Sequence, residues 1–303
     1  ASDFARDGQL EAGPGARHER TTHTRQTTTS ERGTSMRRKA DSGIAAVTAM
    51  CVAAAVLVAF AAASSVHAAP TAQQVLDSVE GSGLLSGSGR AVIEMTVEKG
   101  KQKKMHRLEV FRVDDGKGTS KQMVEFQAPA DVRGTKFLSI TQPDAEDQMW
   151  LYLPAVGRER RIAGSAVQGQ FMGTDFTFEE ISMNENTWKA YAPALAADQK
   201  IDGNLCYVVK LTPKGSGSSY TCVVLYVWQD TSIPLRIEFF GKGGKLQKVM
   251  TFSDIKRTSK GVLQPNMIIL ENASSGSVTT VKIIETDERP ISDDVFSLRY
   301  LRK

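Results

Sequence analysis

The chain has 303 residues, of which 41% are hydrophobic, 7% aromatic and 24% charged, and its formal net charge is +4. This composition allows a sizeable buried core and excludes collagen-like, low-complexity and multi-span membrane proteins. The histidines are His18, His23, His67 and His106. The first three lie in a segment that we expect to be absent from the mature protein. Only His106 then remains, and one histidine is too few for a zinc site and gives a Ser-His or Cys-His dyad a single candidate base. We therefore expect no metal and no cofactor.

The N-terminal part of the chain does not have the composition of a domain. Residues 1–35 are rich in Thr, Arg, Gly and Ser with almost no apolar side chain, which is typical of a disordered extension. Residues 36–68 have the layout of a secretory signal peptide: a basic start at Met36, an uncharged run over 44–63, and small residues before a cleavage point at Ala69. The sequence therefore predicts export of a mature domain over 69–303.

Two alternatives concern the same apolar run. The uncharged stretch 44–63 is long enough for an uncleaved anchor, because about 18 apolar residues can cross a bilayer. Cys51 would be a lipid-attachment cysteine in a third interpretation, but the bulky Met50 precedes it where such sites need a small residue. The alanine-rich run and its peptidase-type ending favour cleavage.

The mature part is almost neutral. Residues 1–68 carry 8 of the 38 basic and 6 of the 34 acidic side chains, so the remainder has a net charge of +2. No basic stripe or long block of like charge is left, which argues against a nucleic-acid partner.

After a helix expected at 71–79, the mature chain is a series of strand patterns. Strands are expected at residues 90–98, 105–113, 121–126, 136–141, 148–153, 205–211, 220–228, 235–240, 246–252, 262–270 and 278–285. The short turns between them predict antiparallel hairpins, and hence a mainly β fold: one large curved antiparallel sheet with a few short helices. The strand 220–228 is apolar on both faces and should be central, whereas Pro265 should place its strand at an edge or a bulge.

Cys206 and Cys222 are the cysteines of the mature part. In a hairpin centred near Lys214 they would face each other across two strands. A disulfide and a pair of buried free thiols both remain open.

The series of strands is interrupted at residues 155–197. Glycines punctuate this stretch, and 175–183 could form a short helix capped by Thr174. Its aromatic side chains would either fill the core as a plug or form a lid over a cavity for an apolar ligand. These aromatic residues are Phe171, Phe176, Phe178, Trp188 and Tyr191.

Three sequence runs in and before this stretch carry a resemblance. They are Gln-Met-Trp-Leu-Tyr-Leu-Pro at 148–154, Val-Gly-Arg-Glu-Arg-Arg-Ile at 156–162 and Phe-Met-Gly-Thr-Asp-Phe at 171–176. Together with Pro129, Arg-Gly-Thr at 133–135 and the run 207–213, they resemble the LolA-like outer-membrane lipoprotein-sorting family, in its broader and longer branch, over about 85–303.

The resemblance implies a periplasmic protein whose unclosed antiparallel barrel surrounds helices and a hydrophobic cavity for acyl chains. The cargo implied is a lipoprotein, a free lipid or another apolar molecule, with transient membrane contact and an inner-membrane transporter as partner. Such a carrier needs a dry cavity, because each methylene exposed to water costs about 0.8 kcal/mol. Its wall and lid are expected at Trp150, Tyr152, Phe171, Met172, Phe176 and Trp188.

Arg158, Arg160 and Arg161 form a compact basic cluster beside this stretch. They would belong to a solvated turn, or contact a phosphate or carboxylate headgroup at the mouth of the cavity. Asp175 would cap the short helix or pair with one of these arginines.

The two other classes of function are an enzyme and a structural factor. No Gly-x-Ser-x-Gly elbow lies between a strand and a helix, so a hydrolase would have to use two carboxylates that are distant in sequence, and we expect no enzyme. A non-catalytic structural or accessory envelope factor would differ from a carrier by a filled core with no cavity.

Overall fold

The computed structural model describes residues 69–82, 88–143, 145–183, 185–215, 217–258 and 261–303. The expected extension and signal peptide, with Cys51, lie outside the described residues. Ala68–Lys303 form one compact unit. In the part of the chain that the structure describes, no helix is both long and apolar enough to span a membrane.

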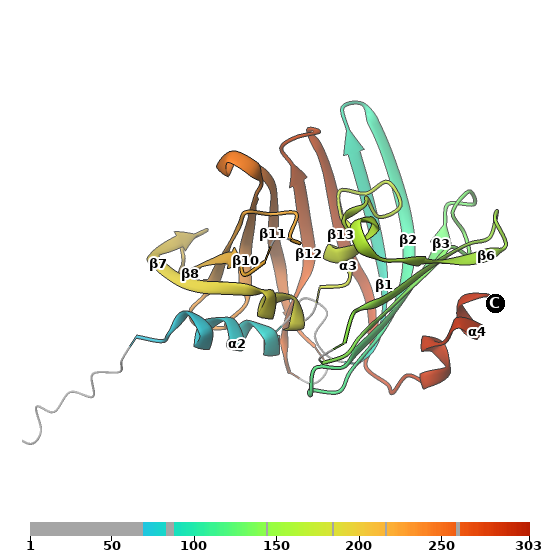
Figure 1. Cartoon of the computed structure of the whole chain (residues 1–303), viewed down its shortest axis with the longest axis horizontal. Helices are drawn as coiled ribbons and strands as arrows, with labels where there is room; N and C mark the ends of the chain where they lie inside the picture. Colours follow the sequence, from blue (N-terminus) through green and yellow to red (C-terminus); the bar gives the residue numbers. More distant parts are fainter. Residues whose placement is uncertain (1–68, 83–87, 144, 184, 216, 259–260) are drawn as a thin grey trace, which may run out of the picture. The chain divides into compact units, whose positions relative to one another are not determined.

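A single antiparallel sheet of 13 strands dominates this unit (Figure 1). The strands are β1 (Gly89–Lys99), β2 (Gln102–Asp114), β3 (Ser120–Ala128), β4 (Lys136–Thr141), β5 (Gln148–Leu153), β6 (Arg158–Ile162), β7 (Tyr191–Ile201), β8 (Asn204–Pro213), β9 (Cys222–Trp228), β10 (Pro234–Phe240), β11 (Leu246–Arg257), β12 (Leu263–Asn272) and β13 (Ser277–Asp287). Their order across the sheet is β6-β5-β4-β3-β2-β1-β13-β12-β11-β10-β9-β8-β7. The edge strands β6 and β7 do not pair, so the curved sheet stays open, as expected.

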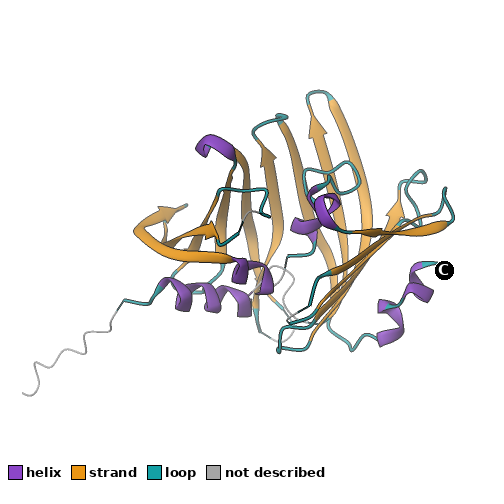
Figure 2. Ribbon diagram, viewed as in Figure 1, coloured by secondary structure: helices purple, strands orange, loops and turns teal. Residues whose placement is uncertain are grey.

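The helices are few and short (Figure 2). They are α2 (Ala72–Ser82), η1 (Gly164–Gln168), α3 (Phe178–Ile181), η2 (Glu185–Ala190), η3 (Lys242–Gly244), η4 (Asp293–Phe296) and α4 (Leu298–Leu301). Thr71 and Gln74 cap α2 reciprocally, since each side chain accepts a hydrogen bond from the main-chain N–H of the other. Val75, Leu76 and Val79 then face the sheet and join its main core.

Sequence periodicity located every strand except β6 and β7. β6 is Arg-Glu-Arg-Arg-Ile and β7 is rich in alanine with Pro193, so neither has the apolar alternation of a half-buried strand. Both form at the margins of the sheet, where one pairing partner is sufficient and few side chains need burial.

The prediction for β9 is confirmed. It lies inside the sheet, with Val223, Leu225 and Val227 in the main core and Val224 and Tyr226 in a second cluster on the other face. Its continuous apolar run reflects burial on both sides.

The prediction for Pro265 is wrong. Its strand, β12, is internal, and Pro265 pairs with Ile255 of β11. The ladder between β12 and β13 starts only at Met267, so no hydrogen bond is required of the proline nitrogen on that side.

The predicted juxtaposition of Cys206 and Cys222 is also wrong. Cys206 is opposite Trp228 in the β8–β9 ladder, whereas Cys222 is opposite Phe240 of β10, and both thiols are free. The turn between the two strands is centred near Gly217 rather than Lys214, which shifts the register by several residues. The two cysteines pack at different ends of the second cluster as small apolar side chains.

Candidate functional site

Residues 163–190, here called the plug segment, cross the inner face of the sheet between β6 and β7. The segment contains η1, α3 and η2, and Gln170 and Thr177 form an isolated antiparallel bridge within it. Its apolar side chains join the main core together with those of α2 and the sheet. The segment therefore occupies the place where an apolar ligand of this sheet would lie.

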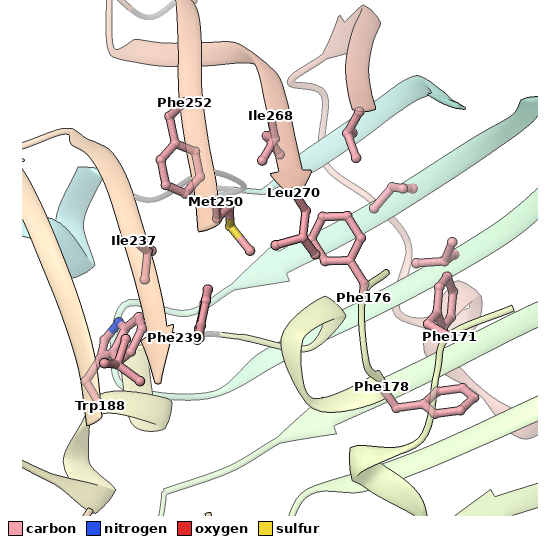
Figure 3. Close-up of a cluster of buried hydrophobic side chains, with 14 of the residues drawn as sticks. Phe171, Phe176, Phe178, Trp188, Ile237, Phe239, Met250, Phe252, Ile268 and Leu270 are labelled. Carbon is pink, nitrogen blue, oxygen red and sulfur yellow. The ribbon is translucent and has the colours of Figure 1, made fainter. Parts of the chain in front are cut away.

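Aromatic rings fix the plug segment to the sheet (Figure 3). The Phe171 side chain is fully buried, and its ring centroid lies 5.8 Å from that of Phe126 and 5.4 Å from that of Phe137. Phe178 of α3 meets the ring of Phe171 edge-on at 5.5 Å. Phe176 points toward Leu270 of β12. These contacts are apolar, and the edge-on ring pairs have a geometry that aromatic side chains prefer.

The helix α3 begins three residues later than the sequence predicts. Thr177, not Thr174, is its cap: its hydroxyl accepts from Glu180 N at 3.1 Å, and the Glu180 carboxylate accepts from Thr177 N at 2.8 Å. The Thr174 hydroxyl donates instead to the main-chain oxygen of Phe171 at 2.7 Å. This bond closes the turn around Met172 and Gly173, both of which have positive φ.

A buried ion pair ties α3 to the sheet. The Lys248 ammonium of β11 donates to the two carboxylate oxygens of Glu180 at 3.0 and 2.8 Å and to the main-chain oxygen of Asp175 at 2.7 Å. The Tyr220 hydroxyl donates to the same carboxylate. Burial and the negative charge of Glu180 raise the pKa of Tyr220, so the phenol stays protonated and remains a donor.

Asp175 makes the second polar attachment. Its carboxylate accepts hydrogen bonds from the hydroxyls of Ser277 and Thr279 and from the Asn272 side-chain amide, the last two at 2.7 and 3.2 Å. Its main-chain N–H donates to Thr279 Oγ1 at 2.9 Å. The prediction that Asp175 caps the helix or pairs with an arginine is therefore wrong. Its role is to join the plug segment to β12 and β13.

A cavity of about 590 Å³ opens beside the plug segment. Its lining includes Met149, Val167 and Tyr191 together with the carboxylates of Asp147 and Glu179. Burial raises the pKa of both carboxyl groups, and the nearby negative charges of Glu180 and Asp147 raise that of Glu179 further. The volume is within the usual range of small-molecule sites, about 300–1,000 Å³.

The six residues expected at the cavity wall do not share one face. Phe171, Phe176 and Trp188 are buried in the main core, and Met172 packs against it. Trp150 and Tyr152 lie on the opposite face of β5, in a cluster with Leu301 and Phe296 of the C-terminal segment. Because β5 is apolar on both faces, its sequence does not show which side faces inward.

The three arginines lie on the edge strand β6, with exposed side chains. None of them lines the cavity. Their neighbour Glu159 pairs with Arg302 near the C-terminus, and this hydrogen bond lowers the pKa of Glu159 to about 2.

Sequence reasoning missed Lys248 and Tyr220. Lys248 stands between the apolar residues Leu246 and Val249, at a position where the alternation of β11 places a buried side chain. That break in the pattern is the signal that could have found it, because a lysine is almost never buried without a partner. No group of three or more metal-ligating side chains exists among the residues that the structure describes.

Comparisons with known proteins identify the fold. A family model described as an "uncharacterized protein" family matches residues 118–303, more than half of the chain. No curated protein matches the sequence.

Three solved structures are similar over most of the unit. An outer membrane lipoprotein-sorting protein domain from Vibrio parahaemolyticus has 24% identity and a TM-score of 0.70, covering 76% of this chain and 97% of its own. A DUF1329 family protein from Desulfovibrio piger has 25% identity and a TM-score of 0.70, covering 77% and 100%. A LolA superfamily protein from Nitrosomonas europaea has 24% identity and a TM-score of 0.62, covering 77% and 100%.

These matches confirm the resemblance and the fold class that the sequence predicted. The chain belongs to the family of uncharacterized proteins whose model matches residues 118–303, and its fold is that of the LolA-like outer-membrane lipoprotein-sorting proteins.

Proposed function

We propose that this protein is a non-catalytic carrier that binds acyl chains of lipoproteins or lipids in the periplasm. The observation that carries the proposal is the cavity of about 590 Å³ that opens between the plug segment and the strands of an open apolar sheet. The similarity to a lipoprotein-sorting domain supports it.

Exchange of the plug segment for cargo is the proposed mechanism. An acyl chain bound on the inner face would replace the contacts of Phe171, Phe176 and Phe178 with equivalent apolar contacts. The methylenes of the cargo leave water at a gain of about 0.8 kcal/mol each, which offsets the cost of about 1.5–3 kcal/mol for each phenylalanine that the displaced segment exposes to water. The cavity beside the segment supplies the space into which the first part of the chain enters.

The polar attachments decide how easily the segment moves. Glu180 and Asp175 hold it to β11, β12 and β13 through directional bonds. If these bonds are kept, only the part of the plug segment before Asp175 can move away from the sheet. A full opening must also separate the buried Lys248–Glu180 pair. Arg158, Arg160 and Arg161, on the edge strand that precedes the segment, would contact an anionic headgroup only in an open state.

The test combines uptake of a fluorescent fatty-acyl probe with hydrogen exchange. Probe binding should weaken the protection of amides within the plug segment, among them Phe171 N, which donates to Phe176 O at 2.8 Å, and Phe178 N, which donates to Gly169 O at 3.1 Å. Amides of β3 should keep their protection.

A matched pair of variants separates this effect from loss of stability. Phe176 and Phe296 are both almost fully buried phenylalanines, the first in the plug segment and the second on the opposite face of the sheet. Phe176→Ala should raise the affinity for the probe because opening becomes easier, whereas Phe296→Ala should leave it unchanged. No uptake by any of the three proteins would overturn the proposal.

A structural or accessory envelope factor, working with an inner-membrane transporter, is the second candidate. It is favoured by the close packing of the plug segment against the sheet, which leaves the inner face filled. Copurification with a membrane transporter, without lipid and without probe uptake, would establish it in place of the carrier.

A further inference from the structure

One end of the sheet is basic. Successive turns at this end connect β1 to β2, β12 to β13 and β10 to β11, and Figure 1 shows them along one rim. The first and the third of these turns carry exposed lysines, and the second carries no charge. The exposed lysines of this basic rim are Lys99, Lys101, Lys103, Lys104, Lys242 and Lys245. Among the described residues, Lys103 is the only one of these six lysines that forms an ion pair. Its partner is Glu98, at 2.8 Å.

Large apolar side chains stand beside the lysines. Met105 at the start of β2 is 58% exposed and Leu246 at the start of β11 is 38% exposed, and they are two of the few large apolar residues that the described structure leaves in solvent. Exposure of this kind next to basic residues is a feature of surfaces that enter the headgroup region of a bilayer.

Sheet geometry spreads the basic rim over a broad front. β1 and β11 are separated by β13 and β12, so the two lysine groups are about 15 Å apart at a spacing of about 4.8 Å per strand. β2 pairs with β3 only from Arg107 onward, so the β1–β2 hairpin extends about 17 Å past the neighbouring strand. Neither of the two described cavities includes any of the six lysines, which fits a flat partner better than a peptide that needs a groove.

Charge is distributed unevenly along the strands. Turns at the opposite end of the sheet carry both signs of charge: Asp115, Glu146, Asp147, Asp202 and Asp230 lie at the same end as Lys117, Arg257 and Arg289. A nearly neutral protein with an excess of unpaired lysines at one end has a field that orients this end toward an anionic surface before contact.

We infer that the basic rim docks on an anionic phospholipid surface, with Met105 and Leu246 entering the headgroup layer. The six lysines are outside the plug segment and its cavity, whereas Asn272 and Ser277, which flank the middle turn of the rim, bind Asp175 of the plug segment. Each lysine near an anionic bilayer contributes about fivefold to affinity, and the contribution falls as salt screens the charges.

Vesicle flotation of the full chain tests the inference. Vesicles of phosphatidylcholine alone measure the binding that does not depend on lipid charge, including any binding by residues 44–63. Vesicles of equimolar phosphatidylcholine and phosphatidylglycerol add the charge-dependent binding. The charge-dependent binding should be strong at about 0.05 M salt and mostly lost at about 0.5 M salt.

Two charge variants of equal size locate the surface. Lys101→Gln with Lys242→Gln should weaken the charge-dependent binding about 30-fold. Lys117→Gln with Lys200→Gln removes two exposed lysines at the opposite end of the sheet and should leave the charge-dependent binding unchanged. Met105→Ser should reduce the binding that persists at high salt, whereas Ile284→Ser, which removes another exposed apolar side chain, should not.

The outcomes are distinct. Equal binding to the two kinds of vesicle, or equal loss in both double variants, would overturn the inference. So would retention on an immobilised acidic peptide without vesicle binding, which would assign the rim to a protein partner. Uptake of the acyl probe should be the same in all of these variants, so failure of docking and failure of the carrier function are separable.

Discussion

Lys248 and Glu180 form a pair whose energetic role follows from burial. Their side chains are 11% and 2% exposed, and Glu180 also accepts from Tyr220 and from Thr177 N. A buried pair contributes little compared with an apolar replacement, yet removal of one partner leaves a charge without compensation. The pair therefore fixes the position of α3 more than it adds to net stability.

Lys248→Met tests this role. It leaves Glu180 buried without its cation, and the free energy of unfolding should fall by about 3–5 kcal/mol in a urea titration. Adding Glu180→Gln should restore part of the loss, because the amide oxygen still accepts from Tyr220 and carries no charge. A single variant that costs less than about 1 kcal/mol would contradict the assignment.

His106 is a buried histidine of β2 without a polar partner at Nδ1 among the described residues, and its ring lies edge-on to Phe126 at 5.6 Å. Burial is the main reason that its pKa is lowered. The unfolded chain, with a pKa near 6.5, therefore binds the proton more readily than the folded protein, and stability is lost as the pH falls below about 6.5.

His106→Leu should remove this dependence. Free energies of unfolding measured near neutral pH and at mildly acidic pH should differ less in the variant than in the native chain. The same acid-induced loss in both proteins would show that other groups cause it.

At the scale of secondary-structure elements, the strand register explains why the two cysteines are free thiols. Cys206 and Cys222 sit at different ends of the β8–β9 pair, and burial raises the pKa of both thiols. Raised values keep them as thiols near neutral pH, which slows oxidation.

Alkylation in denaturant without a reductant should modify both cysteines in protein isolated from an oxidising compartment. The same treatment after reduction is the control and should give the same peptide masses. A peptide that contains Cys206 linked to Cys222 would contradict the register.

The edge strands show why local pattern is insufficient at this scale. β6 carries Arg158, Arg160 and Arg161 and yet forms a strand, because pairing with β5 supplies its main-chain hydrogen bonds and its edge tolerates charge. Only Ile162 of this strand is buried, against the main core. The sequence shows these arginines as a cluster, but it does not show that the strand they form pairs with β5.

At the scale of the molecule, an open sheet creates two kinds of surface. The inner face is covered by α2 and the plug segment, which belong to the proposed carrier function, and the strand ends at one side of the sheet form the basic rim. The near-neutral net charge of residues 69–303 conceals this local excess of lysines. Charge sums therefore describe the solubility of the chain and not its docking surfaces.

The sequence by itself determined the fold class, because period-two apolar alternation and short turns allow only antiparallel hairpins, and most strand positions followed directly. It also singled out the aromatic residues of the stretch 155–197, all five of which are buried: Phe171, Phe176, Phe178, Trp188 and Tyr191. Only the tertiary structure decided which face of β5 is inside, where Asp175 binds, and that Lys248 reaches Glu180 across 68 positions of the chain. These features depend on register and on contacts between distant segments, and local sequence patterns do not encode the pairing of strands across a sheet.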